Sequence, residues 1–343
     1  MHLIFAPNVR AGGGLVLLQS LLSGWTGPAD LCAVLDERAQ PELHIPRHVR
    51  ADWIGAGLSA RLRAEWRLAR STDSSILCFH GLPPLFLMRR PDTRIVIFLQ
   101  NSLVVDRSSL HGYPLKMRVR IRMERLLFRW RAPHVSAIIV QGPAIARDLA
   151  ALLGGRAPQV HIRPFAAHIG SLAPDRRMRR FDFIYPASGE PHKNHEMLLA
   201  AWEQLKQEGL APSLALTLGP RDLALWQSLQ ARAGRAGLNL SNLGYLPRQA
   251  MLEAYGDSGA LVFPSTRESF GLPLVEASMA GLPIVAGELD FVRDVCEPAE
   301  SFDPTSPISI ARAVKRHLGK QNDHISVLTP ESFWAALNGD TSA

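Results

Sequence analysis

At 343 residues, 47% of them hydrophobic, the chain is too long for one ordinary core and indicates a globular protein of two domains. Its three cysteines, Cys32, Cys78 and Cys296, are far apart and lack a paired-ligand spacing, which argues against a disulfide framework and against a zinc site. The formal charge of +7 is uneven, because residues 1–175 hold 22 Lys and Arg against 12 Asp and Glu, whereas residues 176–343 hold 16 against 19.

This asymmetry predicts a basic first half that meets an anionic partner. Nucleic acid is not expected, since no aromatic-rich binding motif or known nucleic-acid module is present. The start of the chain has no basic stretch before its apolar run, unlike a signal peptide, and no apolar run approaches the length that spans a bilayer. We therefore expect a cytoplasmic protein, in solution or on the inner face of the membrane.

Short apolar runs alternate with helical patterns in the first half, as in a parallel sheet wrapped by helices. Strands are predicted over residues 2–5, 31–35, 75–79, 94–99, 136–140 and 160–164, and helices over residues 15–22 and after residue 143. The glycines Gly12, Gly13 and Gly14 follow the first strand. They form either a tight turn or a loop that approaches a phosphate closely. The dinucleotide fingerprint Gly-x-Gly-x-x-Gly is absent, which disfavours an NAD site.

The alternating pattern starts again after a polar linker with four arginines at residues 174–180. Strands are predicted over residues 181–185, 214–218, 238–243, 259–263 and 284–286, with helices over residues 195–208, up to about 235, 248–255, 272–280 and 308–318. We predict an α/β fold of two doubly wound, Rossmann-like domains, residues 1–173 and 181–325, facing a central cleft. Residues 326–343 are predicted as a C-terminal tail that could pack back on the first domain.

Two carboxylates flank a turn in the segment from Pro264 to Ser278. Glu268 lies in the loop after a buried strand, and Glu276 lies one turn inside a helix that starts near Leu272 and stops before Gly281-Leu282-Pro283. A helix N-terminus at the carboxyl end of a parallel strand offers free N–H groups and partial positive charge to a phosphate. The alternative is a loop acid and a solvated helix acid without a binding role.

A lysine occupies the corresponding place after the first strand of the second half. Lys193 lies in the segment from Ser188 to His195, between that strand and the next helix. There it could neutralise a diphosphate in the cleft as a point charge, although a lysine in such a loop is more often simply solvated.

These segments, in their order and spacing, resemble the family 4 retaining glycosyltransferases of the two-Rossmann-domain (GT-B) architecture, of the bacterial surface-polysaccharide type. The resemblance rests on Gly189 to Asn194, Leu243-Gly244-Tyr245-Leu246 before a helix ending in Tyr255, and Phe263 to Ala277 with its Glu268-x7-Glu276 pair. Gly281 to Ala286 and Phe302-Asp303-Pro304 extend it. It covers residues 181–318 well and the first domain in outline.

The resemblance implies that the second domain binds a nucleotide-diphosphate sugar. Glu276 would hold the ribose hydroxyls, Glu268 would lie against the sugar ring, and Lys193 would stabilise the diphosphate leaving group. Lys193 and Glu268 are accordingly the predicted catalytic residues. The predicted donor-binding residues are Gly13, Gly14, Gly189, Lys193, Gly244, Tyr245, Glu268, Ser269, Phe270, Gly271, Leu272 and Glu276. No metal-binding Asp-x-Asp occurs, so no metal or other cofactor is expected.

The chain also departs from the family pattern. Many relatives carry an arginine just upstream of the lysine, where this chain has Ala187, Ser188 and Gly189. The alternatives are that Arg267 or Arg163 supplies that second cation, or that this chain has none. Relatives often place a histidine at the end of a first-domain strand, for which His80 is the nearest candidate. Gln100 and Asn101 could bind sugar hydroxyls of the acceptor, or merely cap the loop that follows.

A basic amphipathic helix is predicted over residues 116–131. Its projection sets Arg118, Arg122, Arg125 and Arg129 on one face and apolar residues, Val119, Met123, Leu126, Leu127 and Trp130, on another. The arginine face could meet anionic lipid headgroups beside a lipid-linked acceptor. The alternative is a solvated face over an apolar stripe that packs in the core.

Taken together, these features predict a metal-independent, retaining hexosyltransferase. It would move a sugar from a nucleotide-diphosphate donor to a lipid-linked or saccharide acceptor in O-antigen, capsule or exopolysaccharide synthesis. Guanine with mannose is the donor we name, although base contacts in this architecture are mostly made by the backbone. The alternatives are a nucleotide-sugar epimerase of the same architecture, which should need acid and base groups around the sugar C2, and a non-catalytic nucleotide-sugar-binding protein. A phosphorylase would need a cofactor-bearing lysine and a much longer chain.

Overall fold

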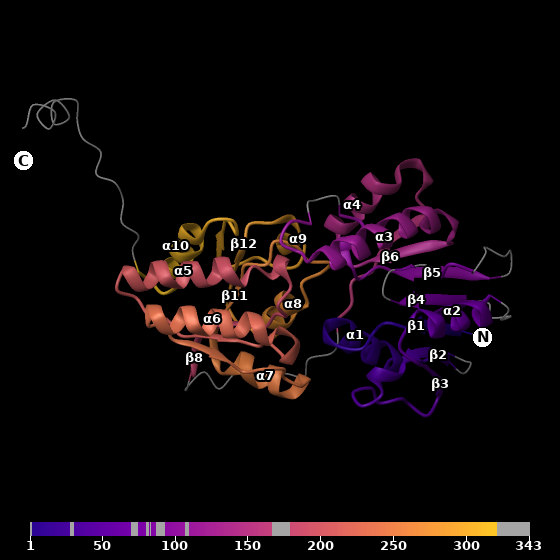
Figure 1. Ribbon diagram of the computed structural model, residues 1–343, viewed down its shortest axis with the longest axis horizontal. Helices are drawn as coiled ribbons and strands as arrows, with labels where there is room; N and C mark the ends of the chain where they lie inside the picture. The colour runs from indigo at the N-terminus through magenta and orange to yellow at the C-terminus, as the bar shows by residue number, and fades with distance from the viewer. Residues whose placement is uncertain are drawn as a thin grey trace, which may run out of the picture.

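The computed structural model describes residues 2–27, 31–69, 75–79, 82, 84–86, 93–106, 110–166 and 179–320. Within these ranges the chain forms two α/β domains, each built on one parallel sheet that helices cover (Figure 1). The predicted fold class is therefore confirmed. The predicted tail, residues 326–343, and most of the predicted linker lie outside the described residues.

The first domain holds a parallel sheet in the order β3-β2-β1-β4-β5-β6-β7. Its strands are β1 (His2–Ala6), β2 (Leu31–Asp36), β3 (Val49–Ile54), β4 (Ser75–Phe79), β5 (Arg94–Phe98), β6 (Ala137–Val140) and β7 (Gln159–Ile162). The helices are α1 (Gly12–Ser23), α2 (Leu58–Leu68), α3 (Leu115–Arg131) and α4 (Pro143–Leu153), with short 3₁₀ turns such as η2 (Ser102–Val104). Apolar side chains of α1 join one core cluster, and those of α2, α3 and α4 join another.

The second domain repeats this arrangement in a sheet of order β10-β9-β8-β11-β12-β13. Its strands are β8 (Phe181–Tyr185), β9 (Leu214–Leu216), β10 (Leu240–Asn242), β11 (Ser258–Phe263), β12 (Ile284–Gly287) and β13 (Glu300–Phe302). The helices are α5 (His195–Gln207), α6 (Leu223–Ala236), α7 (Arg248–Gly256), α8 (Leu272–Met279), α9 (Asp290–Arg293) and α10 (Pro307–His317), with 3₁₀ turns η5 (Pro191–Lys193) and η6 (Pro220–Asp222). One core cluster around Tyr185 and Trp202 holds these elements together.

Four elements are missing from the sequence prediction: the edge strands β3 and β13, the helix α2, and the helix α9, which has only four residues. Strand β3 is only partly buried, so it lacks the continuous apolar run of a central parallel strand. Strand β13 has three residues, and α2 carries three arginines in its eleven residues. The glycine triplet also differs from its prediction, because Gly12, Gly13 and Gly14 form the first turn of α1 rather than a loop.

The strand order reverses direction beside β1 in the first domain and beside β8 in the second. Ligands of open α/β sheets bind outside the carboxyl ends of the strands at such switch points. The segments that follow β8 and β11 are therefore the first places to look for a site in the second domain. They carry Lys193 and Glu268, respectively.

Candidate active site

The turn that carries Lys193 is held in place by its neighbours. Asn194 adopts a left-handed conformation, with φ of 65°, which asparagine tolerates better than most residues. Its side-chain Nδ2 donates to the carbonyl oxygens of Pro264, at 3.2 Å, and Pro304, at 2.7 Å. The hydroxyl of Tyr185 donates to the carbonyl of Lys193 at 2.7 Å. Three loops are thereby tied together around the lysine.

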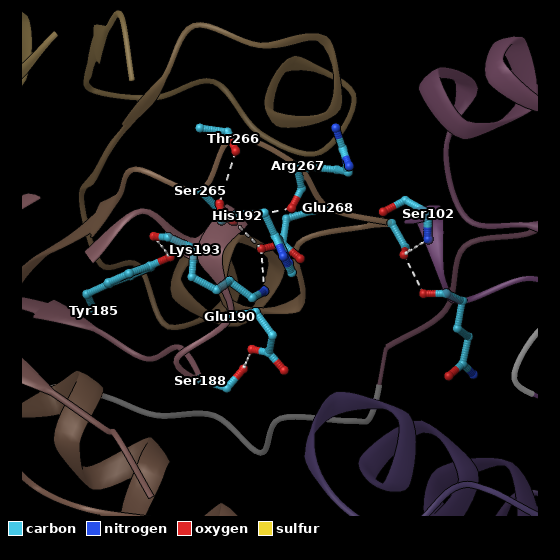
Figure 2. A network of polar contacts seen from close by, with 12 residues as sticks. Ser102, Tyr185, Ser188, Glu190, His192, Lys193, Ser265, Thr266, Arg267 and Glu268 are labelled. Carbon is cyan, nitrogen blue, oxygen red and sulfur yellow. Dashed lines mark hydrogen bonds and ion pairs between the residues drawn. The ribbon is translucent and has the colours of Figure 1, made fainter. Parts of the chain in front are cut away.

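Lys193 forms an ion pair with Glu268 across the switch point (Figure 2). The Nζ of Lys193 lies 2.6 Å from Oε1 of Glu268, and the two side chains are only 16% and 13% exposed. The hydroxyl of Ser265 donates to the same oxygen at 2.7 Å. The structure thus joins the two residues that the sequence predicts as catalytic. A cation held this way, at the cleft and partly shielded from water, interacts strongly with an incoming anion.

His192 connects this turn to the first domain and is missing from the predicted site. Its carbonyl accepts from the backbone N–H of Thr266 at 2.9 Å, and its ring Nδ1 lies 2.8 Å from the hydroxyl of Tyr113. Burial, followed by the charge of Lys193, lowers the pKa of His192 to about 4. The imidazole is therefore neutral at physiological pH. Its position beside Lys193 is the only feature of the sequence that could have indicated that His192 links this turn to the first domain.

Glu276 belongs to a separate network. Its Oε2 accepts from the hydroxyl of Tyr255 at 3.0 Å, and its Oε1 accepts from a guanidinium N–H of Arg248 at 3.1 Å. Burial raises the pKa of Glu276, although the hydrogen bond from Tyr255 and the charge of Arg248 act in the opposite direction. Tyr255 and Arg248 are site residues that the sequence analysis names only as parts of a helix. Glu268 and Glu276 are thus held by separate sets of hydrogen bonds, an arrangement compatible with contacts to two ends of one ligand.

The N-termini of α1 and α8 meet across the cleft. Gly271 precedes α8 with φ of 76°, a conformation that favours glycine, and neither helix has an acidic residue in its first turn. A Cβ at Gly13 would lie 2.6 Å from Cδ1 of Leu272, so the glycine allows this close approach. Two helix N-termini with unsatisfied N–H groups therefore lie near each other, which favours an anion between the domains.

Other predicted donor-binding residues have side chains that join the domains. The hydroxyl of Ser269 donates to the carbonyl of Gln100 and accepts from the backbone N–H of Ser102, the latter at 2.9 Å (Figure 2). The hydroxyl of Tyr245 donates to Oε2 of Glu42 at 2.6 Å. These side chains contribute to closure of the cleft. Two further predicted donor-binding residues are glycines: Gly244 has φ of 72°, and Gly189 lies against Asp222. The predicted residue Phe270 is half-buried just before α8.

On the first-domain side, a cavity of about 720 Å³ lies at the carboxyl ends of β1, β4 and β5. Gln100 and Asn101 both line it. The side-chain oxygen of Asn101 accepts from the N–H of Leu103 at 3.1 Å, so it caps η2, as the alternative interpretation predicts. The Nε2 atom of Gln100 is buried and has no hydrogen-bond partner among the described residues. The remaining predicted acceptor residue, His80, lies outside the described residues.

The two candidates for a second diphosphate cation differ in their surroundings. Arg267 forms an ion pair with Asp106 of the first domain, so its charge is already balanced. Arg163 is exposed, and it donates to the carbonyl of its neighbour Ile162 at 3.1 Å. The carbonyl of Arg267 accepts from the hydroxyl of Ser265, but neither guanidinium group contacts Lys193 or Glu268 within the described residues.

The faces of α3 are as predicted, but their environments are not. The helix buries Ile121 and Phe128, which turns Arg118 and Arg125 partly inward, and Nε of Arg125 donates to the carbonyl of Leu103 at 2.9 Å. Arg118 and Arg125 are therefore less accessible to a membrane than the predicted arginine face implies. Arg122 and Arg129 are exposed. Most of the apolar stripe is exposed as well and does not pack in the core: Leu115, Val119, Met123, Leu126 and Trp130 are 51% to 71% exposed.

Two features of the described residues bear on the cofactor and membrane predictions. No group of three or more His, Cys, Asp or Glu in the described ranges is arranged to hold a metal ion. None of the described helices is both long enough and apolar enough to cross a bilayer. Metal independence and attachment to a membrane surface remain predictions.

Comparison with curated proteins finds relatives of part of the chain. The chain is 33% identical over 147 residues to the serotype-specific mannosyltransferase WbdA of Escherichia coli, which covers 41% of this chain and 18% of that protein. It is 33% identical over 115 residues to the O-antigen chain mannosyltransferase B of Escherichia coli, covering 33% of this chain and 30% of that protein. The matched segment thus spans well under half the length of these relatives.

Comparison with solved structures confirms the fold over both domains. Sucrose-phosphate synthase from Thermosynechococcus elongatus superposes with a TM-score of 0.72 at 18% identity, over 93% of this chain and 90% of that one. At the level of sequence, residues 173–325 match the family described as "Glycosyl transferases group 1". The part of the chain that holds Lys193, Glu268 and Glu276 is therefore a glycosyl transferases group 1 domain, in a chain with the GT-B fold.

Proposed function

We propose that the protein is a retaining glycosyltransferase of family 4. It would transfer a sugar from a nucleotide-diphosphate donor to a lipid-linked or saccharide acceptor during synthesis of a cell-surface polysaccharide. The observation that carries this proposal is the partly buried pair of Lys193 and Glu268 at the switch point of the matched domain. The cavity on the facing domain offers room for an acceptor.

In the proposed complex the donor lies along the second domain. Glu276 accepts hydrogen bonds from the ribose hydroxyls, and Lys193 exchanges its contact with Glu268 for the diphosphate. Glu268 is then free to accept from a hydroxyl of the transferred sugar. The N-termini of α1 and α8 face the same charge and supplement the lysine.

Catalysis in this proposal is electrostatic. Negative charge grows on the diphosphate as the glycosidic bond breaks, and a cation fixed beforehand stabilises that charge without reorganising. Lys193 is fixed in this sense, because its backbone and its ammonium group are both held by hydrogen bonds. The acceptor hydroxyl would attack on the face from which the diphosphate departs, which retains the anomeric configuration. Metal ions have no role in this scheme.

The names of the relatives support mannose as the transferred sugar and O-antigen as the setting. GDP-mannose is therefore the first donor to test. A thermal-shift screen of nucleotide sugars comes first, because a ligand of the native state raises the melting temperature. The best ligand is then incubated with the protein and a saccharide acceptor, and NMR follows the release of the nucleoside diphosphate and the anomeric configuration of the new glycosidic bond.

Retention with stoichiometric release of nucleoside diphosphate is the expected result. An epimerised nucleotide sugar without release would instead assign the protein to the epimerases. Tight binding with neither product would make it a nucleotide-sugar-binding protein. Either result would overturn the proposed reaction.

We further propose that transfer takes place on an anionic membrane, which the exposed stripe of α3 contacts. Five large apolar side chains, Leu115 to Trp130, share this face, and Arg122 and Arg129 border it. Apolar side chains flanked by cations suit the boundary between acyl chains and anionic headgroups, where each arginine adds about 1 kcal/mol. The arginine contribution is smaller than the sequence predicts, since Arg118 and Arg125 turn inward.

Sedimentation with vesicles tests this contact. Vesicles that contain phosphatidylglycerol should bind the protein, and the double variant Leu126→Glu/Trp130→Glu should lose at least tenfold in affinity. The matched control is Leu223→Glu, which alters an equally exposed leucine on α6 of the second domain. Equal binding by all three proteins would exclude α3 as the membrane contact.

A further inference from the structure

The first-domain cavity is unusually rich in arginine. Five arginines line it: Arg10, Arg38, Arg61, Arg120 and Arg221. The first four belong to the first domain, whereas Arg221 reaches the cavity from η6 of the second domain. Both domains therefore direct positive charge at one space of about 720 Å³.

Three of these arginines are neutralised by carboxylates. Arg38 pairs with Asp36 at 2.6 Å, Arg61 with Glu65 at 2.9 Å, and Arg120 with Glu124 at 2.8 Å. These pairs fix the shape of the wall and contribute little net charge.

The other two, Arg10 and Arg221, form no hydrogen bond and no ion pair with any described residue. Burial and then the charge of Arg221 lower the pKa of Arg10 below its ordinary value. The two guanidinium groups therefore repel each other across the cleft. Asp36 attracts Arg10 but is already paired with Arg38, so the two positive charges that face this cavity match the charge of a phosphate dianion or a diphosphate.

A further unsatisfied group lies in the same wall. The Nε2 of Gln100 is buried, and in the part of the chain that the structure describes nothing accepts a hydrogen bond from it, which is costly unless a ligand oxygen does so. Gly14 leaves room beside this amide, because a Cβ there would lie 3.0 Å from Oε1 of Gln100. The cavity thus offers a neutral donor as well as two cations.

We infer that this cavity binds a phosphate or diphosphate group of the acceptor, with Arg10 and Arg221 as its ligands. The inference rests on the proposed function, which places the donor against the second domain. The acceptor class is therefore a phosphorylated sugar or a glycan linked to a lipid by a phosphate or diphosphate. An uncharged saccharide would leave the two guanidinium groups facing each other without a counter-charge. Since the two arginines come from different domains, the bound anion also holds the cleft closed.

The donor diphosphate is the other source of the same chemistry, so the experiment must separate the two. Binding of radiolabelled inorganic pyrophosphate is measured by equilibrium dialysis, with and without a saturating nucleoside diphosphate chosen from the thermal-shift screen. A separate acceptor site keeps binding pyrophosphate when the nucleotide site is full. Loss of all pyrophosphate binding under saturation would assign the arginines to the donor and overturn the inference.

Variants test the residues themselves. Arg10→Ala and Arg221→Ala should each weaken pyrophosphate binding at least tenfold, and Arg10→Lys should recover part of the loss. The matched control is Arg156→Ala, because Arg156 is an exposed arginine of the first domain and is not one of the residues that line the cavity. Melting temperatures show whether each variant folds. If Arg10→Ala does not fold, Arg221→Ala still tests the site, because Arg221 is exposed.

Unchanged binding in both variants would overturn the inference. If no nucleoside diphosphate binds the protein, the proposed function fails, while arginine-dependent pyrophosphate binding still identifies an anion site. If nucleotide binds and pyrophosphate does not, the inference fails and the proposed function stands. The two failures are therefore distinguishable.

Discussion

Replacing Glu276 with glutamine should weaken donor binding while it stabilises the protein without ligand. The carboxylate is buried, and its folded-state pKa lies above the ordinary value. Because protonation of Glu276 favours the native state, the ionised carboxylate destabilises the folded protein. This destabilisation is complete at neutral pH, and it disappears as the pH falls below the folded-state pKa and then below the unfolded-state pKa. A neutral amide of the same shape removes that penalty at pH 7.

The size of both effects follows from the contacts. Hydrogen bonds from two ribose hydroxyls to a carboxylate are about twice as strong as those to an amide, so about 2 to 3 kcal/mol of affinity is lost, or roughly 30- to 150-fold. Relief of the buried charge should raise the melting temperature of the unliganded protein by about 2 °C for each kcal/mol gained. The hydrogen bond from Tyr255 can be kept, since the amide oxygen of glutamine accepts it.

Differential scanning fluorimetry with and without the nucleotide measures both effects in one assay. Glu253→Gln, at an exposed position of the neighbouring helix α7, is the matched control and should change neither value. A lower melting temperature for Glu276→Gln would mean that the pair with Arg248 outweighs the cost of burial. Unchanged nucleotide affinity would refute the assignment of Glu276 to the ribose.

Two further predictions concern the support of the Lys193 turn. Burial lowers the pKa of His192 to about 4 and that of His195 to about 3, so stability should fall as the pH drops below 6.5, by about 2 kcal/mol for each ring at pH 5. Melting temperatures measured from pH 8 to pH 5 check this prediction, and His192→Asn should make the melting temperature less dependent on pH. A melting temperature that does not change with pH in the unmodified protein would contradict the lowered pKa values. Asn194→Ala should cost about 3 kcal/mol, from two hydrogen bonds and a left-handed backbone, whereas Asn194→Gly should cost only the hydrogen bonds, about 2 kcal/mol. Equal melting temperatures for the alanine and glycine variants would show that the backbone contributes nothing.

The sequence predicts the centre of the site because parallel sheets follow a simple rule. Lys193 and Glu268 are 75 residues apart, yet each follows a strand, and the carboxyl ends of parallel strands meet at one edge. Central strands are also predicted well, since burial on both faces gives continuous apolar runs. Edge strands such as β3 do not follow this pattern, because only part of each is buried.

Contacts between the domains could not be predicted in this way. Two such contacts depend on how the two separate sheets are oriented. One is the hydrogen bond between Tyr113 and His192, and the other is the position of Arg10 and Arg221 on opposite sides of the cavity. No local pattern encodes that orientation. Glu276 is similar, because its partners Arg248 and Tyr255 lie on another helix and are ordinary residues there.

Helix α3 shows a different limit of periodicity. The spacing of its side chains fixes which residues share a face, and the structure agrees with those faces. Periodicity does not decide which apolar face is buried when two compete. Ile121 and Phe128 enter the core, while the longer stripe that ends at Trp130 remains at the surface.

The most direct test of glycosyl transfer assisted by Lys193 is a single-turnover measurement with the preferred nucleotide sugar and the Lys193→Ala variant. Loss of a fixed cation at the leaving group should lower the rate about 100- to 1000-fold. The melting temperature should fall, because Glu268 loses its ion-pair partner, but the variant should remain folded at the assay temperature. Lys206→Ala, at an exposed lysine of α5, should turn over normally. Normal turnover by the folded Lys193→Ala variant would contradict the proposed role of this residue at the leaving group.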